Sequence, residues 1–302
     1  MRLGYISPAK INLYLRIVGK QPDGYHQLIS LMCPVSLHDR IYIQFHAKHM
    51  QIKSTDRQVP DNRSNLAFKA AEAFFKATSL DDCVSIDILK RIPVGAGLGG
   101  GSSNAATVLS ALNQWYQLPL TSEQLKSIAL SLGADVPFFL NNTVALVSGI
   151  GECLHQVTID IRNPIIIVYP NFSVSTAWAF KNFNFSLTKE KRDDIKTDLI
   201  SRYKNSQDVQ WISDIQNDLE KIAFQRYPIL SDIKKELRSQ GAMQAVMSGS
   251  GSSIIGIFNE EKKHRNALKN LKQKKTWQII ACHVKNYSNL TQINTSKVDQ
   301  SN

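Results

Sequence analysis

The sequence has no apolar run that could cross a membrane, and its few cysteines lie far apart. Its longest apolar stretches, PIIIVYP and SIIGIF, are much shorter than the ~20 residues that a bilayer-spanning helix needs. The N-terminus alternates like a strand and breaks at Ser7-Pro8, unlike a signal peptide. No C-x-x-C pair or metal-ligand spacing occurs among the four cysteines, which are Cys33, Cys83, Cys153 and Cys282. We therefore expect a cytoplasmic protein with reduced thiols and no membrane partner.

Acidic residues are in the minority: 25 Asp and Glu face 36 Lys and Arg, for a net charge of +11. Such a balance fits anionic partners, whether nucleotides, phosphorylated metabolites or nucleic acid. Much of the excess lies in 260–275, where Leu268 and Leu271 supply the thin apolar stripe of a solvated amphipathic helix. The sequence contains no zinc finger, RNP-like aromatic pattern or interleaved arginine and aromatic run. We therefore expect no nucleic-acid partner, and salt-dependent DNA or RNA binding would test that rival.

The first half alternates like a set of antiparallel strands and then turns to helical spacing. Strand-like alternation covers 3–7, 11–18, 26–34, 39–45 and 84–89, and Asp23-Gly24 is a strong turn signal. A polar loop, 54–64, precedes NLAFKAAEAFFKAT, in which apolar residues recur at helical spacing. A further helix is predicted to begin at Thr121, where Gln124 completes a capping box, and to stop at Gly133.

The second half reads as strands and helices in an order typical of an α+β layer, with helices on one face of an antiparallel sheet. The predicted strands are 164–169, 242–247, 253–258 and 278–284, and the predicted helices are 211–225, 228–240 and the basic segment. Residues 181–210 are charged and irregular, and we interpret them as an insertion.

A glycine-rich loop, RIPVGAGLGGGSSNAA (91–106), separates a predicted strand from a predicted helix. It is not a Walker A loop, because Gly101-Ser102 occupies the place of the lysine and its hydroxyl neighbour. Gly95, Gly97 and Gly100 formally satisfy the dinucleotide pattern G-x-G-x-x-G, but that pattern belongs to a parallel βαβ unit. A protein-kinase flap would join two strands, and a flexible linker would not lie between a good strand and a good helix.

The physical chemistry of this loop favours an anion cradle. Missing side chains let successive backbone N–H groups approach a phosphate, and the helix that starts near Ser102 directs its positive end there. Ser102 and Ser103 are N-cap residue types whose hydroxyls can also reach a phosphate or a metal. The loop therefore predicts phosphate binding.

The stretch PVGAGLGGGSSNAA resembles the ATP-binding motif of the GHMP kinases, a family of small-molecule kinases. SPAKINLYL (7–15) and MSGSGSSIIGIF (247–258) are similar to the N-terminal and C-terminal motifs of that family, and the resemblance covers about 2–285. It implies an α+β, two-domain GHMP kinase fold, with an N-terminal ATP-binding domain and a ferredoxin-like C-terminal substrate domain. We accordingly expect domains at 1–157 and 158–287, followed by a disordered tail at 288–302.

The resemblance also assigns catalytic roles. Asp135 matches the family's catalytic aspartate, which orients the substrate hydroxyl and takes its proton; from the sequence alone it could equally be a helix N-cap before Pro137. Lys10 is expected to pair with Asp135 and to lower the pKa of the substrate hydroxyl. Asn12 shares the strand face of Lys10 and could hydrogen-bond the same alcohol.

Other residues are assigned to the substrate. DGYHQL and SLGADVPFF are similar to a branch of the family whose substrate carries a cytidine diphosphate group. That likeness places Tyr25 and His26 at the cytosine and Phe180 on its opposite face, with Trp178 as a weaker substitute and Thr176 also lining the site. The C-terminal glycines, Gly249 and Gly251, are expected to permit a tight turn against the substrate phosphates.

The nucleotide side follows from the same resemblance. ATP would be bound by the loop, by Asn65 and by Lys90, although Asn65 could be a helix N-cap and Lys90 and Arg91 could merely be cations at a strand end. No additional acidic residue stands out as a metal ligand, so ATP oxygens and water are expected to hold Mg²⁺. The loop residues concerned are Pro93, Val94, Gly95, Ala96, Gly97, Leu98, Gly99, Gly100, Gly101, Ser102 and Ser103.

Taken together, the residues and the resemblance imply an ATP-dependent kinase of isoprenoid precursor synthesis, acting on an alcohol that carries a cytidine diphosphate group. The nearest alternative is a GHMP kinase for mevalonate, homoserine or a sugar, but DGYH argues against it because such substrates present no base to stack. A dinucleotide-dependent oxidoreductase is the rival from another enzyme class. A monomer and a weak homodimer remain equally open.

Overall fold

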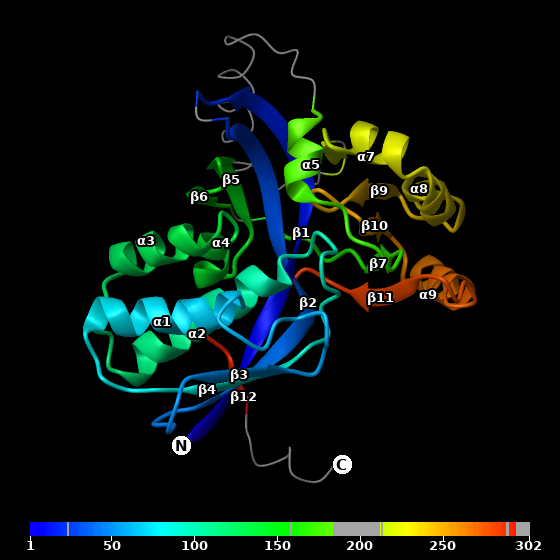
Figure 1. Cartoon of the computed structure of the whole chain (residues 1–302). Coiled ribbons are helices and arrows are strands. Elements are labelled where there is room, and N and C mark those ends of the chain that lie inside the picture. The colour runs from blue at the N-terminus through cyan, green and yellow to red at the C-terminus, as the bar shows by residue number, and fades with distance from the viewer. Residues whose placement is uncertain (23, 158, 184–211, 213, 288–289, 294–302) are drawn as a thin grey trace.

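The computed structural model describes the chain except for residues 23, 158, 184–211, 213, 288–289 and 294–302. Asp23 of the predicted turn, nearly all of the predicted insertion and most of the predicted tail therefore lie outside the described residues. The described part forms two sheets with helices packed on them (Figure 1). No helix within it is long and apolar enough to span a bilayer.

The larger sheet has eight strands among the described residues and is built around two long neighbours, β1 (Arg2–Lys20) and β2 (His26–Gln44). Its path runs β12-β1-β2-β4-β3, with β5 beside β2, β6 beside β5 and β8 beside β1. The remaining strands are β3 (Gln51–Ser54), β4 (Ser85–Leu89), β5 (Ala145–Gly149), β6 (Cys153–Gln156), β8 (Gln216–Asn217) and β12 (Gln292–Ile293).

β1 and β2 each run unbroken through 19 residues, so the predicted division into 3–7, 11–18, 26–34 and 39–45 was wrong. The pairing absorbs the expected break at Pro8 through a register shift between Pro8 and Lys10, and two further shifts follow along β1. A β-bulge tolerates a proline that cannot donate to the ladder and bends the strand without ending it. Nearly all of β1 is buried, which favours one continuous ladder over separate short strands.

Four helices cover one face of the larger sheet: α1 (Leu66–Thr78), α2 (Gly100–Trp115), α3 (Ser122–Leu132) and α4 (Val136–Asn141) (Figure 1). The capping box of Thr121 and Gln124 is formed, and α3 is followed by Gly133 at its C-cap, as the sequence predicts. Apolar side chains of α1, α2 and α4 pack with those of β2 and β4 in one core.

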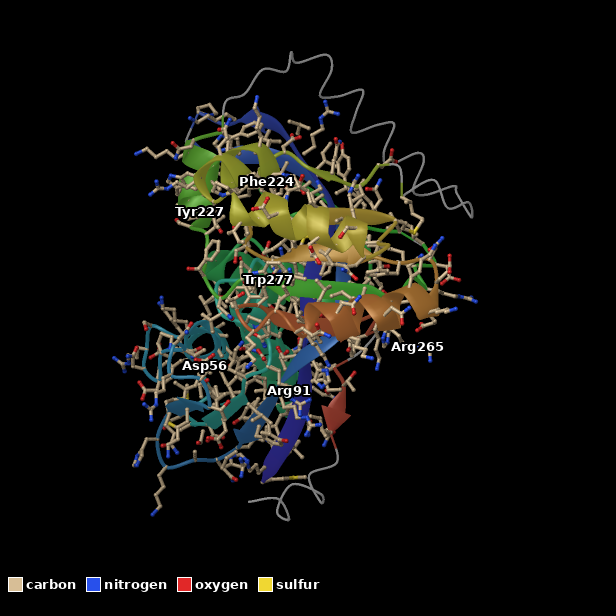
Figure 2. All side chains as sticks on the ribbon, turned by 90° about the vertical axis from the view of Figure 1, so that its right-hand side faces the viewer. Asp56, Arg91, Phe224, Tyr227, Arg265 and Trp277 are labelled. Atoms are coloured by element: carbon tan, nitrogen blue, oxygen red, sulfur yellow. The ribbon has the colours of Figure 1, made fainter. Side chains whose placement is uncertain are left out.

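The smaller sheet has the order β11-β7-β10-β9 and is antiparallel throughout. Its strands are β7 (Ile165–Tyr169), β9 (Gln244–Met247), β10 (Ile254–Ile257) and β11 (Gln278–Cys282). The helices described in this half are α5 (Thr176–Lys181), α7 (Glu220–Arg226), α8 (Ile229–Ser239) and α9 (Glu261–Leu271). The basic segment thus forms α9, with Ala267 and Leu271 buried and Arg265 exposed on the outer face (Figure 2).

The predicted helix at 211–225 was wrong in its first half, because α7 begins only at Glu220. Before it, β8 pairs in parallel with β1. Side chains favour this arrangement over a helix: the Asp218 carboxylate accepts from the backbone N–H of Ile17, and the Asn217 amide donates to the carbonyls of Met247 and Gly249. These tertiary bonds hold the segment extended.

The two halves share a core and two strand pairings. Ile11 and Ile29 of the larger sheet pack in one cluster with Ile165 and Ile255 of the smaller one. β12, at Gln292–Ile293, pairs antiparallel with β1, so this part of the expected disordered tail is ordered. The division at residue 157 stays a prediction, and β8 and β12 both return across it to β1.

Candidate active site

The glycine loop joins β4 to α2 and needs glycine for two separate physical reasons. Gly97 and Gly99 both have positive φ, at 76° and 70°, where side-chain-bearing residues are strained. A Cβ on Gly97 would lie 2.3 Å from the carbonyl oxygen of Ser248, and one on Gly99 would lie 2.8 Å from the ring of Phe139. The loop is therefore in close contact with the turn between β9 and β10, which contains Ser248, on one side and with α4, which contains Phe139, on the other. Gly99 is the N-cap of α2, so the N-terminus of that helix faces the loop.

One cavity of about 460 Å³ brings most of the predicted site residues together. The loop from Pro93 to Ser102 forms one wall, and Lys10, Asn12 and Asp135 lie beside it. The cavity is also lined by residues predicted for the nucleotide and the substrate, namely Asn65, Lys90, Thr176, Phe180, Gly249 and Gly251. Three predicted residues are not among its lining: Ser103, Tyr25 and His26.

Lys10 and Asp135 form an ion pair in the lining of this cavity. The Lys10 Nζ lies 3.7 Å from Asp135 Oδ2, and the lysine side chain is only 5% exposed whereas the aspartate is 41% exposed. Asp135 occupies the N-cap position of α4 but makes no side-chain capping bond, so the N-cap interpretation does not account for its carboxylate. The pair thus presents a half-exposed carboxylate next to a buried ammonium, an arrangement suited to accepting a proton from a bound alcohol.

Asn12 lies beside Lys10 and is itself held by serines that the sequence analysis missed. Lys10 Nζ donates to Asn12 Oδ1 at 2.6 Å, and Asn12 Nδ2 donates to Ser30 Oγ at 2.7 Å. The hydroxyl of Ser30 in turn donates to the carbonyl of Tyr14 at 2.7 Å. Ser248 accepts from the backbone N–H of Asn12 and donates to the carbonyl of Gly97, which ties the smaller sheet's turn to the loop.

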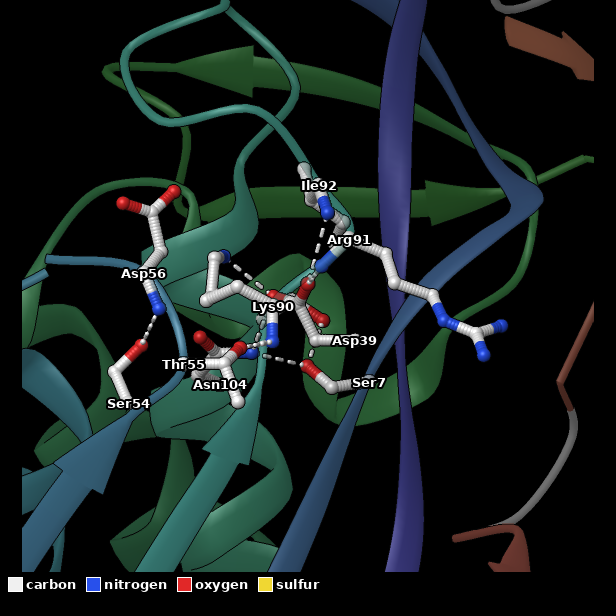
Figure 3. A network of polar contacts seen from close by, with 10 residues as sticks. Ser7, Asp39, Ser54, Thr55, Asp56, Lys90, Arg91, Ile92 and Asn104 are labelled. Atoms are coloured by element: carbon white, nitrogen blue, oxygen red, sulfur yellow. Dashed lines mark hydrogen bonds and ion pairs between the residues drawn. The ribbon is translucent and has the colours of Figure 1, made fainter. Parts of the chain in front are cut away.

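Asp39 is a further residue that the sequence analysis missed. It is completely buried and accepts four hydrogen bonds, from the backbone N–H groups of Arg91 and Ile92, from Lys90 Nζ and from the Asn104 amide (Figure 3). Its partners lie at both ends of the glycine loop, so one carboxylate closes the loop at its base. An aspartate within the strand-like LHDRIYI is the signal that could have indicated a buried charge.

Lys90 and Arg91 have different roles in this network. Lys90 lines the cavity and forms a 2.5 Å ion pair with Asp39, with both side chains almost fully buried. Arg91 contributes only its backbone N–H, and its guanidinium extends away from Asp39 toward the surface (Figure 3). Ser103 also belongs to this network, because its hydroxyl shares a hydrogen bond with Ser7 and is buried below the loop.

At the end of the cavity where the cytosine is predicted to bind, the aromatic side chains do not form the predicted sandwich. Phe180 packs against His26, with ring centroids 5.4 Å apart and planes tilted by 34°. Tyr25 is 62% exposed and is not among the residues that line the cavity. Burial, and secondarily the charge of Lys20, lower the pKa of His26, which favours the neutral imidazole. Trp178 contacts Tyr227 and is not among the lining residues either.

The remaining predicted residues divide between structure and lining. Asn65 caps α1, accepting from the N–H of Ala67, and it also lines the cavity, so both readings of it fit the geometry. The Thr176 hydroxyl shares a hydrogen bond with Ser250 in the turn that contains Gly249 and Gly251. Within the described residues no three His, Cys, Asp or Glu side chains form a cluster that could hold a metal.

Comparison with known proteins identifies the family. The model of the GHMP kinases N terminal domain matches residues 65–143, and that of the GHMP kinases C terminal domain matches 199–275. The chain belongs to the GHMP kinase family and is a small-molecule kinase, which confirms the predicted fold class and enzyme class.

Two relatives that carry the same name are similar to this chain over most of their length. The chain is 38% identical over 280 residues, 92% of its length and 97% of the relative's, to 4-diphosphocytidyl-2-C-methyl-D-erythritol kinase of Syntrophotalea carbinolica. It is 39% identical over 279 residues to the kinase of the same name from Geobacter metallireducens, covering 91% and 96% of the two chains.

Solved structures agree at the level of the fold. A crystal structure of 4-(cytidine 5'-diphospho)-2C-methyl-D-erythritol kinase matches with a TM-score of 0.75 and 31% identity, covering 94% of this chain and 100% of that one. Homoserine kinase from Cytophaga hutchinsonii matches with a TM-score of 0.76 at 17% identity, covering 97% of each chain, which is a likeness of fold alone.

Proposed function

We propose that this kinase transfers the γ-phosphate of ATP to the 2-hydroxyl of 4-diphosphocytidyl-2-C-methyl-D-erythritol. The observation that carries the proposal is the Lys10–Asp135 pair, which lies in the same cavity as the glycine loop and the Phe180 ring. The relatives of that name, at 38–39% identity over nearly the whole chain, support the choice of substrate. Use of ATP agrees with the cytoplasmic location expected from the sequence.

ATP would bind with its phosphates against the backbone N–H groups of the glycine loop and the N-terminus of α2. Mg²⁺ would enter as part of the MgATP substrate, because it prefers phosphate oxygens and water and needs few protein ligands. Two of the oxygen-bearing side chains that line the cavity stand at helix N-termini: Ser102 lies in the first turn of α2, and Asp135 is at the N-cap position of α4. Asn65 and Lys90 would lie on the nucleotide side.

The chemical step follows from the proposed roles of Asp135 and Lys10. Asp135 accepts the proton of the substrate hydroxyl while that oxygen forms a bond to the γ-phosphorus, and the bond from this phosphorus to the β-γ bridging oxygen breaks to release ADP. Lys10, 3.7 Å from Asp135, stabilises the negative charge that develops on the reacting oxygen. Phosphoryl transfer requires little more of the protein than positioning and electrostatics.

The cytosine would bind at the other end of the cavity. Phe180 supplies a face on which a base can stack, and the neutral His26 next to it can hydrogen-bond the edge of that base. The diphosphate would lie against the turn of Gly249 and Gly251, between the base and the reacting hydroxyl. We also propose the division into an ATP-binding domain, 1–157, and a substrate domain, 158–287.

A coupled ADP-release assay across several alcohols tests the function. We expect turnover with 4-diphosphocytidyl-2-C-methyl-D-erythritol and none with mevalonate or homoserine, which lack a base for Phe180. Turnover of mevalonate or homoserine together with silence toward the cytidine substrate would overturn the proposed substrate and leave the kinase class intact.

A further inference from the structure

The buried hydroxyl of Ser30 lies two hydrogen bonds away from the Lys10 ammonium. Ser30 is 1% exposed, sits on β2 and connects the backbone of Tyr14 to the side-chain amide of Asn12. Asn12 then contacts Lys10, and Lys10 faces Asp135. Each link has a direction, because a carbonyl only accepts hydrogen bonds and an ammonium only donates them.

The donor and acceptor of each hydrogen bond in this series are fixed from both ends, by Tyr14 at one end and Lys10 at the other. The carbonyl of Tyr14 can only accept, so the Ser30 O–H must donate to it, and the lone pairs of Ser30 are left to accept. Asn12 must therefore present its NH₂ group to Ser30. At the other end the Lys10 ammonium has no acceptor, so the Asn12 atom that it contacts must be the oxygen. Both constraints independently demand the same orientation of one amide.

We propose that Ser30 is a positioning residue for catalysis, which holds the Asn12 amide with its oxygen toward Lys10 so that the ammonium is kept against Asp135. Without the Ser30 acceptor, only the Lys10 contact would orient the Asn12 amide, and its NH₂ group, left without a partner, would draw the side chain out of the position in which its oxygen meets the ammonium. Lys10 would then move away from its 2.6 Å contact, and its alignment with Asp135 would be lost. The reacting hydroxyl is the one proposed above, so this inference rests on the proposed function.

The neighbouring strand offers a matched control. Ser148 on β5 is 2% exposed, and its hydroxyl has no hydrogen-bond partner among the described residues. It pairs with Ile29, the residue next to Ser30, and is not among the residues that line the cavity. Ser148→Ala thus removes a buried hydroxyl from the same region of the sheet without touching the chain to Lys10.

The kinetic test compares Ser30→Ala and Ser30→Cys with Ser148→Ala, using concentrations of active sites from nucleotide titration. We expect both Ser30 variants to lower kcat about tenfold, equivalent to ~1.4 kcal/mol of barrier, with KM for ATP within about twofold because the loop is untouched. Ser148→Ala should keep kcat. Cysteine keeps the shape of serine with a somewhat larger atom that is a much weaker acceptor, so the test does not depend on the alanine variant folding. Equal kcat values for Ser30→Cys and Ser148→Ala would overturn the proposal.

A second readout requires no turnover. The side-chain amide protons of Asn12, assigned by NMR through their loss in Asn12→Ser, should exchange slowly with solvent in the native chain and faster in Ser30→Cys. Unchanged exchange would refute the positioning role even if kcat fell. Because this readout needs no substrate, it keeps a failure of the inference distinct from a failure of the proposed function, which would appear as absent turnover in the unmodified enzyme.

Discussion

The two ends of the cavity are built in different ways. The phosphate end consists of backbone: positive-φ glycines in close contact with Phe139 and Ser248, tied at the base of the loop by a carboxylate with no exposure to solvent. The base end consists of side chains, with Phe180 and His26 as a partly exposed aromatic pair. Under the proposed function, the first arrangement would fix the position of a phosphate before it binds. The second would leave the choice of substrate to a few replaceable side chains.

The largest effect on kcat is expected from a substitution of Asp135, which we place between the two ends of the cavity. Asp135→Asn preserves the shape of the side chain but removes the proton acceptor and the negative charge beside Lys10. We expect kcat to fall roughly 10²–10⁴-fold, the range for a general base, while both ATP and the cytidine substrate still bind. Rapid-quench kinetics and calorimetry of nucleotide binding measure the two quantities. A variant with most of its kcat would reduce Asp135 to a helix-capping position.

The next effect concerns stability at the phosphate end. Asp39→Ala leaves Lys90 buried without its counterion and two backbone N–H groups without an acceptor. We expect a loss of about 3–5 kcal/mol in the free energy of unfolding, with weaker ATP binding in the folded fraction. Denaturant titration measures the loss.

The control for Asp39 is Asp87→Ala on β4, whose ion pair with Arg2 is exposed. Exposed pairs contribute about 0–1 kcal/mol, so this variant should remain close to the native stability. If both variants unfolded at the same denaturant concentration, the buried pair would not be what closes the loop.

A smaller effect is expected at the base end. Phe180→Ala should raise KM for the cytidine substrate roughly five- to hundredfold, because base stacking on an aromatic ring contributes ~1–3 kcal/mol. Tyr25→Ala is the matched control, since Tyr25 is also aromatic but is not among the lining residues. KM for ATP should not change in either variant. A larger effect of Tyr25→Ala than of Phe180→Ala would restore the predicted sandwich.

The smallest effect concerns pH. The pKa of His26 in the folded chain is lowered from 6.5, mainly by burial, so the folded state binds this proton less readily than the unfolded state. Its contribution to stability is therefore complete above the unfolded pKa and is lost as the pH falls through 6.5 toward the lower folded value. We also expect KM for the cytidine substrate to rise over this window as the ring becomes charged, whereas His26→Gln should show a flatter profile. An identical pH profile in that variant would exclude His26 as the titrating group.

What the sequence could predict depends on how far apart in the chain the contacting residues lie. The capping box at Thr121 depends on neighbouring residues alone and was predicted correctly, whereas the predicted phosphate-binding role of Gly97 stays a prediction. Asp39 could not be recognised in this way, because its partners Lys90 and Asn104 lie 51 and 65 residues away along the chain. The same holds for Ser30 and for the extended segment before α7, where tertiary hydrogen bonds override helical spacing.

For the predicted cytosine site, the resemblance selected two residues that lie together in the structure, but not the predicted arrangement of all three aromatic side chains. His26 and Phe180 do meet, although they are far apart in sequence, whereas Tyr25 points to a more exposed position. Whether an aromatic side chain next to a turn faces a cavity depends on the turn's own conformation, and sequence alone does not specify that. The predicted roles of the individual site residues stay predictions until the variants are measured.

β1 has a consequence for how the polypeptide is made. It precedes the other described strands in the sequence, yet its ladder includes β8 near residue 216 and β12 near residue 292, and the backbone N–H of Asn12 donates to Ser248 Oγ. Such long-range pairing slows folding, because distant segments must meet before they gain any stability. The strand that carries Lys10 therefore completes its described pairings only after residues near 216 and 292 have been made.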